Sequence, residues 1–187
     1  MAKKKVTKET AESMARRQRE ISVSEFFLKN RHLLGFDSPR KAMMTAVKEA
    51  VDNSLDACEE AGILPEIAVE LMQVADNRFL VTVQDNGPGI VRAQVPKVFA
   101  KLLYGSKFHR LRMSRGQQGI GISAAGMYGQ LTTGSATVIL TKTKNSPQAH
   151  RVAVQIDTRA NKPAVLKDEA EDWQPEFPPE NPEQGPV

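Results

Sequence analysis

Glu49 and Asn53 lie four residues apart in a segment with helical periodicity, Glu-Ala-Val-Asp-Asn-Ser-Leu-Asp-Ala. Residues at this spacing lie on one face of a helix, and Asp56 shares that face. The side-chain oxygen of Asn53 suits a hard cation such as Mg²⁺, and the Glu49 carboxylate can orient and deprotonate a water molecule. Acidic residues on a helix more often simply face solvent. The pair alone therefore leaves both interpretations open.

A second group, Asp85-Asn86-Gly87-Pro88-Gly89, directly follows a predicted strand. Gly87 and Gly89 let the backbone approach a flat ligand closely. The Asp85 carboxylate, at a strand end, can accept a hydrogen bond from an amino group. The alternative is an ordinary turn, because Asn-Gly and Pro-Gly are common turn dipeptides.

A third group, Gly116-Gln117-Gln118-Gly119-Ile120-Gly121, opens a segment of helical periodicity. Free backbone N–H groups at a helix N-terminus can hold phosphate. The spacing differs from that of a P-loop and from the G-x-G-x-x-G dinucleotide motif. Taken alone, it is a weak indication of phosphate binding.

The charge around this third group is strongly positive. Ten Lys or Arg and no Asp or Glu occur between residues 86 and 156. Lysines and arginines also precede the glycines, namely Lys101, Lys107, Arg110, Arg112 and Arg115. This pattern indicates either a polyanionic ligand or partner, or a solvated basic surface.

The elements that position these groups have clear boundary signals. Ser38 suits a helix N-cap, Pro39 the first helical position and Gly62 the position after the end, which predicts a helix over about 39–61. Two segments rich in Val, Ile, Leu and Phe, 67–74 and 79–84, predict a β-hairpin.

Further along the chain, the pattern predicts helices over 94–103 and 119–130 and strands over 136–142 and 151–157. The order of helices and strands has no βαβ alternation. It predicts an α+β fold with helices on one face of a mixed β-sheet.

The 187 residues indicate one domain with tails. We expect a flexible basic arm over 1–20, an apolar segment over 21–36 that must be buried on this domain or on a partner, and a domain over 37–167. Residues 168–187 hold seven acidic residues, five prolines and no Lys or Arg, which predicts a disordered tail.

Several classes of protein are disfavoured by composition. A single cysteine, Cys58, excludes an internal disulfide framework and a cysteine-based zinc site. No stretch approaches the roughly 18 apolar residues of a membrane helix. No apolar segment follows the basic N-terminus as in a secretory signal, so we expect a cytoplasmic protein without membrane association.

The order and spacing of the three groups resemble the Bergerat-fold (GHKL) ATPases, the superfamily of type II topoisomerase ATPase domains, heat-shock chaperones, sensor histidine kinases and mismatch-repair proteins. Glu49 and Asn53 match the first box of that family. Asp85, Gly87 and Gly89 match its adenine-binding box, and 116–121 match its ATP-lid box. The resemblance implies a two-layer sandwich of helices on a mixed sheet, with ATP and Mg²⁺ as ligands.

The chain is still more similar to the B subunit of DNA topoisomerase VI, a type IIB topoisomerase. The segments 24–36, 62–65 and 104–107 carry this resemblance, which runs from Ile21 to Asp157. It implies an ATP-operated clamp in which two B subunits dimerise on binding ATP. With the A subunit, in an A2B2 heterotetramer, the clamp relaxes duplex DNA by double-strand passage. Part of 21–36 is then a strap for the partner subunit.

The resemblance also implies a role for each matched residue. Glu49 is the general base for water, Asn53 holds Mg²⁺ against the triphosphate, and Asp85 accepts from the adenine amino group. Gly87 and Gly89 belong to the same ATP site. Around the phosphates we expect Ser106, Lys107, Gly116, Gln117, Gln118, Gly119, Ile120, Gly121, Ile122 and Ser123.

Two parts of the family's pattern are not matched. A Gly-Thr pair that helps to bind adenine is not found, since Thr133-Gly134 has the reverse order and another place. A transducer domain, whose lysine reaches the γ-phosphate, does not follow. We therefore expect a truncated ATPase domain that binds Mg-ATP weakly, with hydrolysis near background and no stable nucleotide-locked dimer.

Two alternatives remain beside this interpretation. One is a nucleotide-binding fragment without turnover. The other is a histidine-kinase-like ATPase, which would need a phosphoacceptor histidine upstream. His32 is the only histidine there, and it lies in the topoisomerase-like segment.

Overall fold

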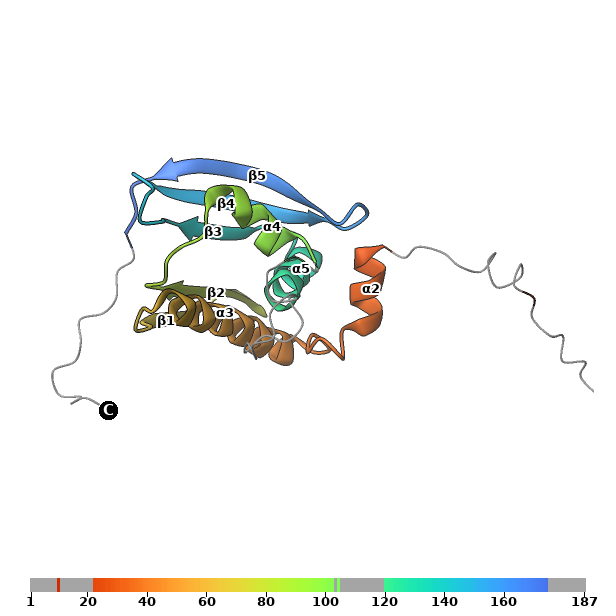
Figure 1. The fold of residues 1–187 in the computed structure, drawn as a ribbon. Coiled ribbons are helices and arrows are strands. Elements are labelled where there is room, and N and C mark those ends of the chain that lie inside the picture. The colour runs from red at the N-terminus through yellow and green to blue at the C-terminus, as the bar shows by residue number, and fades with distance from the viewer. Residues whose placement is uncertain (1–9, 11–21, 103, 105–119, 175–187) are drawn as a thin grey trace, which may run out of the picture.

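The computed structural model describes residues 10, 22–102, 104 and 120–174. The chain forms two layers of strands with helices between and beside them (Figure 1). In chain order the elements are α2 (Val23–Asn30), α3 (Pro39–Ala61), β1 (Ile67–Ala75), β2 (Arg78–Asp85), the 3-10 helix η1 (Arg92–Gln94), α4 (Val95–Ala100), α5 (Gly121–Thr133), β3 (Thr137–Thr141), β4 (Ala149–Asp157) and β5 (Lys162–Glu171).

Helix α3 begins and ends where the capping residues predict. The Ser38 hydroxyl accepts from the backbone N–H of Lys41, and Pro39 takes the first helical position. Gly62 ends the helix in a left-handed conformation at φ +67°, with its N–H directed at the carbonyls of Cys58 and Glu59. A residue with a Cβ adopts this conformation at a cost, so glycine provides a sharp end.

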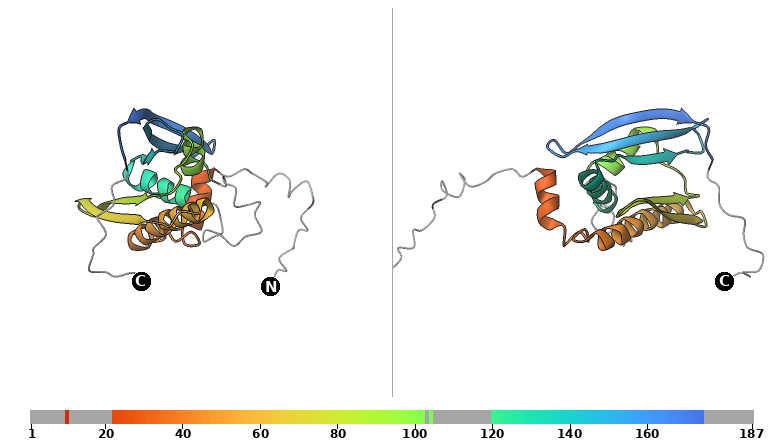
Figure 2. Two further views of the ribbon diagram at one scale, coloured as in Figure 1. Left: turned by 60° about the vertical axis from the view of Figure 1, so that its left-hand side comes forward. Right: turned by 180° about the vertical axis from the view of Figure 1, so that it is seen from behind.

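The predicted hairpin is also confirmed. Strands β1 and β2 pair antiparallel with Ile67 opposite Asp85, and Asn77 occupies the turn at φ +56°. One face of this hairpin lies on α3 (Figure 2). The register therefore brings Asp85, the last residue of β2, against the middle of α3.

A second sheet has the order β3-β4-β5. Its first two strands were predicted, whereas β5 was not, because its lysines and acidic residues hide the apolar pattern. Arg151 on β4 forms a two-pronged ion pair with Glu171 on β5, which raises the pKa of Arg151 and lowers that of Glu171. Charged side chains are common on such an edge strand. The predicted start of the tail at Asp168 thus falls inside β5.

The α+β class is confirmed, but the strand pairing differs from one mixed sheet. Every strand pair in the described part of the chain is antiparallel, and the strands form two sheets. The connection from β2 to β3 passes through α4 and α5, which lie between the sheets (Figures 1 and 2). Within the described residues, β2 and β3 do not pair with each other.

The main core lies between α4, α5 and the inner face of the second sheet. Its largest fully buried side chains include Val95, Met127, Val152 and Val154. Helix α2 joins this core through Phe27, and its first N–H donates to the Thr158 carbonyl beyond β4.

The apolar segment before α3 is only partly buried in this chain. Phe36 lies 5.6 Å from the ring of Phe27 and 5.5 Å from that of Tyr128, and is 1% exposed. In contrast, Phe26, Leu28 and Leu33 are exposed. The segment is therefore in part a core element of this domain, and a strap role for the exposed residues stays a prediction.

We expect Phe36→Ala to lower the free energy of unfolding by about 3–5 kcal/mol, because it removes a buried ring and leaves a cavity. Leu33→Ala, three residues earlier, is the control, since Leu33 is 71% exposed. Urea denaturation of both variants measures the difference. Equal, small losses would place Phe36 outside the core.

Candidate functional site

Glu49 and Asn53 lie in the middle of α3, on the side where α5 begins. The Glu49 side chain is 22% exposed, and its carboxylate lies so close to Gly121 that a Cβ there would overlap it. Asn53, one turn further on, is half-buried. The structure therefore brings the carboxylate of the first motif to the first helical residue of the third motif, although the two are 72 positions apart in the sequence.

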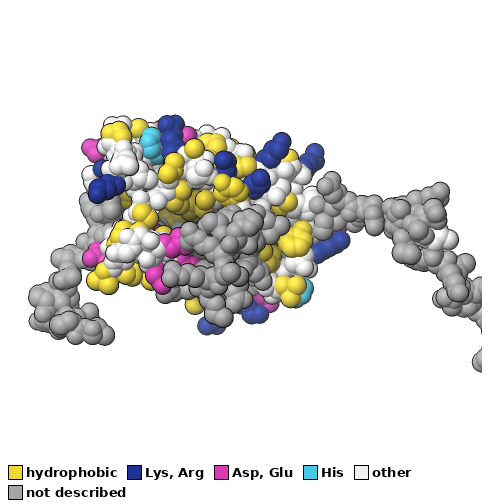
Figure 3. Space-filling model, in the orientation of Figure 1, with side chains coloured by type: hydrophobic (Ala, Val, Ile, Leu, Met, Phe, Trp, Pro, Cys, Tyr) yellow, Lys and Arg dark blue, Asp and Glu magenta, His cyan; other side chains and the backbone are white. Residues whose placement is uncertain are grey.

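The surface charge differs between the two layers. Figure 3 shows Asp and Glu side chains gathered over α3, whereas Lys and Arg lie mainly over the second sheet. Next to Glu49, Lys48 forms an ion pair with Asp52 at 2.6 Å and lies 4.0 Å from the Glu49 carboxylate. The hydrogen bond from Lys48 to Asp52 is the main reason why the pKa of Lys48 is raised.

Asp85 is held by two donors from within the protein. The Ser54 hydroxyl donates to one carboxylate oxygen at 2.7 Å, and the Gly87 N–H donates to the other at 2.9 Å. Ser54 is 7% exposed, so the first contact is shielded from water. An ionised carboxylate has about four acceptor positions. Asp85 therefore keeps acceptor capacity for a ligand while its orientation is set.

The two glycines of the second motif are both in close contact. A Cβ at Gly87 would lie 2.8 Å from an Asp85 carboxylate oxygen, and one at Gly89, where φ is +72°, would overlap the Lys142 carbonyl. The next residue, Ile90, donates its N–H to the Thr141 hydroxyl, which donates in turn to the Ile90 carbonyl. The turn is thereby attached to the end of β3.

The start of α5 carries the last four predicted phosphate contacts. Its first residues present N–H groups that have no partner within the helix, as at any helix N-terminus. Ile120 is buried, and Ser123 is 1% exposed with its hydroxyl donating to the Ile120 carbonyl. The side chain of Ser123 thus supports the helix start, which leaves its backbone and those of Gly121 and Ile122 for the predicted role. The predictions for Ser106, Lys107 and residues 116–119 lie outside the described residues.

Sequence analysis did not select two residues that hold the site together. Ser54 belongs to the apolar stripe of α3 by its spacing, yet its hydroxyl meets Asp85. Thr141 ends β3 and ties it to Ile90. A polar residue within an otherwise apolar stripe was the available signal for Ser54, whereas nothing local distinguishes Thr141.

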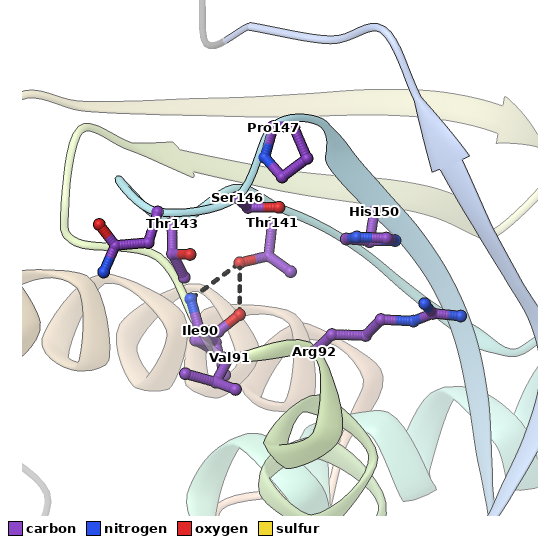
Figure 4. A pocket seen from close by; sticks show the side chains of 9 residues that line it. Ile90, Val91, Arg92, Thr141, Thr143, Ser146, Pro147 and His150 are labelled. Atoms are coloured by element: carbon purple, nitrogen blue, oxygen red, sulfur yellow. Dashed lines mark hydrogen bonds between the residues drawn. The ribbon is translucent and has the colours of Figure 1, made fainter.

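A pocket of about 300 Å³ begins directly after Gly89. Figure 4 shows Ile90, Val91 and Arg92 on one side of it and Thr141 and His150 on the other. The Nδ1 atom of His150 is buried without a hydrogen-bond partner among the described residues. None of the predicted site residues lines this pocket.

Two further features concern the described part of the chain alone. It contains no group of three or more His, Cys, Asp or Glu side chains placed to hold a metal ion. None of its helices is long and apolar enough to cross a membrane.

Comparison with protein families identifies the arrangement. The family described as histidine kinase-, DNA gyrase B-, and HSP90-like ATPase matches residues 39–172. The chain belongs to this ATPase family. The match begins with α3 and ends just after β5, so it contains all three motifs. The resemblance inferred from those motifs is confirmed.

Curated relatives named as the B subunit of type 2 DNA topoisomerase 6 are similar over most of this chain. The protein of Methanosarcina acetivorans is 59% identical over 163 residues, which cover 87% of this chain and 26% of that protein. That of Archaeoglobus fulgidus is 57% identical, covering 86% and 26%. That of Halobacterium salinarum is 58% identical, covering 83% and 19%. The chain spans about a quarter of the length of the first two relatives.

Proposed function

We propose that this chain is the ATP-binding and ATP-hydrolysing part of the B subunit of a type IIB DNA topoisomerase, topoisomerase VI. The main observation in favour is that α3 carries two sites of different chemistry. Near one part of the helix, Ser54 orients the Asp85 carboxylate, and near another the Glu49 carboxylate lies at the start of α5. The similarity to topoisomerase 6 B subunits over most of the chain also favours this function.

The residues present fit a bound Mg-ATP. Asp85 accepts a hydrogen bond from the adenine amino group, and the close approach at Gly87 leaves room beside the base. Asn53 offers its side-chain oxygen to Mg²⁺. Magnesium commonly takes one or two protein ligands, with phosphate oxygens and water as the rest. A single protein ligand such as Asn53 is therefore enough beside the phosphates.

Hydrolysis requires a base beside the terminal phosphate. Glu49 is the proposed base, and it accepts the proton of the attacking water. The N–H groups at the start of α5 stabilise the negative charge of the phosphates. A glycine at 121 permits the approach of the carboxylate to this end of α5, since any larger residue would displace it.

We further propose that the chain works as part of a larger assembly. The names of the relatives favour a B subunit that acts with an A subunit on duplex DNA, in an A2B2 complex that closes by dimerisation of the B subunits. Titration of the chain with ATP in the presence and absence of Mg²⁺ tests binding. Phosphate release with and without an added A subunit tests the assembly. No ATP binding by the chain would refute the proposal.

Asp85→Asn is expected to weaken ATP binding by about 1–3 kcal/mol, or roughly 5- to 150-fold. One oxygen becomes an NH₂ group, so that a donor faces either Ser54, Gly87 or the adenine amino group. Calorimetric titration with ATP measures the change, with GTP as the comparison ligand. Unchanged ATP affinity would remove Asp85 from the site.

A further inference from the structure

The side chain of Asn86, which directly follows Asp85, is anchored on the segment before β1. Its Nδ2 atom donates to the Leu64 carbonyl at 3.0 Å, and its Oδ1 atom accepts from the Glu66 N–H at 3.0 Å. The Cys58 thiol donates to the same oxygen at 3.5 Å. The backbone N–H of Asn86 also donates to the Glu66 carbonyl. The carboxamide thereby uses both acceptor positions and one donor within the protein.

This anchor continues the contact that α3 makes with Asp85. Ser54 and Cys58 lie one helical turn apart on α3, and they are 7% and 0% exposed. Ser54 bonds to Asp85 and Cys58 to Asn86, so one face of the helix holds two consecutive residues of the turn. Gly87 closes the contact, since a Cβ there would lie 3.3 Å from the Cys58 sulfur.

We propose that Asn86 is a positioning residue for nucleotide recognition, which acts through Asp85 without touching the ligand; this rests on the proposed function. The Gly87 N–H bonds to Asp85 across Asn86, so the direction of the carboxylate depends on where the backbone of residue 86 lies. The Asn86 side chain sets that position against Leu64 and Glu66. When the anchor is lost, the carboxylate can rotate away from the amino group that it accepts from.

The test uses the full 187-residue chain and two readouts. The first is the affinity for Mg-ATP by calorimetry. The second is the rate at which a thiol reagent labels Cys58, the single cysteine, without nucleotide. The variants are Asn86→Ala, which removes the whole anchor, and Asn86→Asp, which keeps its size but places an oxygen against the Leu64 carbonyl. The control is Asn77→Ala at the opposite end of the hairpin, where φ is +56° and alanine is strained.

Both Asn86 variants are expected to bind ATP about tenfold more weakly, as the loss of buried hydrogen bonds would produce. They should also label Cys58 about tenfold faster, because the segment that covers the thiol opens more often. Asn77→Ala should change neither readout by more than about twofold, even though it lowers stability. The free energy of unfolding of each variant is measured alongside, and Asn86→Asp decides the question if Asn86→Ala does not fold.

ATP affinity within about twofold of the unaltered chain in the folded Asn86 variants would overturn the positioning role, whatever the labelling rate. An equal loss of affinity in Asn77→Ala would also overturn it, because general destabilisation would then be the cause. If the unaltered chain binds no ATP, the proposed function fails and the positioning role fails with it. The labelling comparison would still show whether Asn86 anchors the turn.

Discussion

Replacement of Glu49 by Gln is expected to lower ATP hydrolysis by about 10²–10⁴-fold, the usual contribution of a general base, while ATP binding is retained. Gln has nearly the same size as Glu, so the close contact with Gly121 is preserved. It cannot accept a proton from water at neutral pH. The effect should therefore fall on the rate of the chemical step and leave the affinity almost unchanged.

The measurement is single-turnover phosphate release, in the context of a full-length B subunit, together with calorimetric titration of ATP. Glu59→Gln is the matched control, since Glu59 lies exposed on the same helix, away from α5. Turnover that survives within a few-fold in Glu49→Gln would mean that another residue is the base. A comparable loss in Glu59→Gln would point to an effect on α3 as a whole.

Gly89→Ala is expected to destabilise the domain strongly, although it adds only one methyl group. The left-handed backbone at φ +72° costs an alanine about 1–2 kcal/mol. The new Cβ would also overlap the backbone carbonyl of Lys142, which cannot rotate away as a side chain can. Overpacking of this kind adds about 1–3 kcal/mol. The turn must therefore separate from β3, and ATP binding should weaken with it.

Gly134→Ala separates these two contributions. Gly134 has φ +74°, but no atom lies within 4 Å of the position of its Cβ, so alanine there meets only the backbone cost. Urea denaturation of both variants gives the difference, which we expect to be at least about 1 kcal/mol. Equal losses of stability in the two variants would show that the turn does not press on Lys142.

The sequence alone determined the elements whose boundaries depend on neighbouring residues. Helix α3 was predicted to the residue, because Ser38, Pro39 and Gly62 act within one turn of its ends. The hairpin β1–β2 followed from two apolar segments around a short turn. The matching of Glu49, Asn53 and Asp85 to an ATPase family also needed no structure, and the family comparison confirmed that membership.

The tertiary structure decided which of these residues meet. The approach of Glu49 to Gly121, the bond from Ser54 to Asp85 and the attachment of Ile90 to Thr141 join residues that lie 72, 31 and 51 positions apart. Strand β5 escaped prediction for a related reason, since its charged residues are stabilised by Arg151 on another strand. Caps, turns and periodicity arise from contacts between near neighbours and are legible in the sequence. Contacts between layers depend on how the elements pack, and they appear only once the chain is folded.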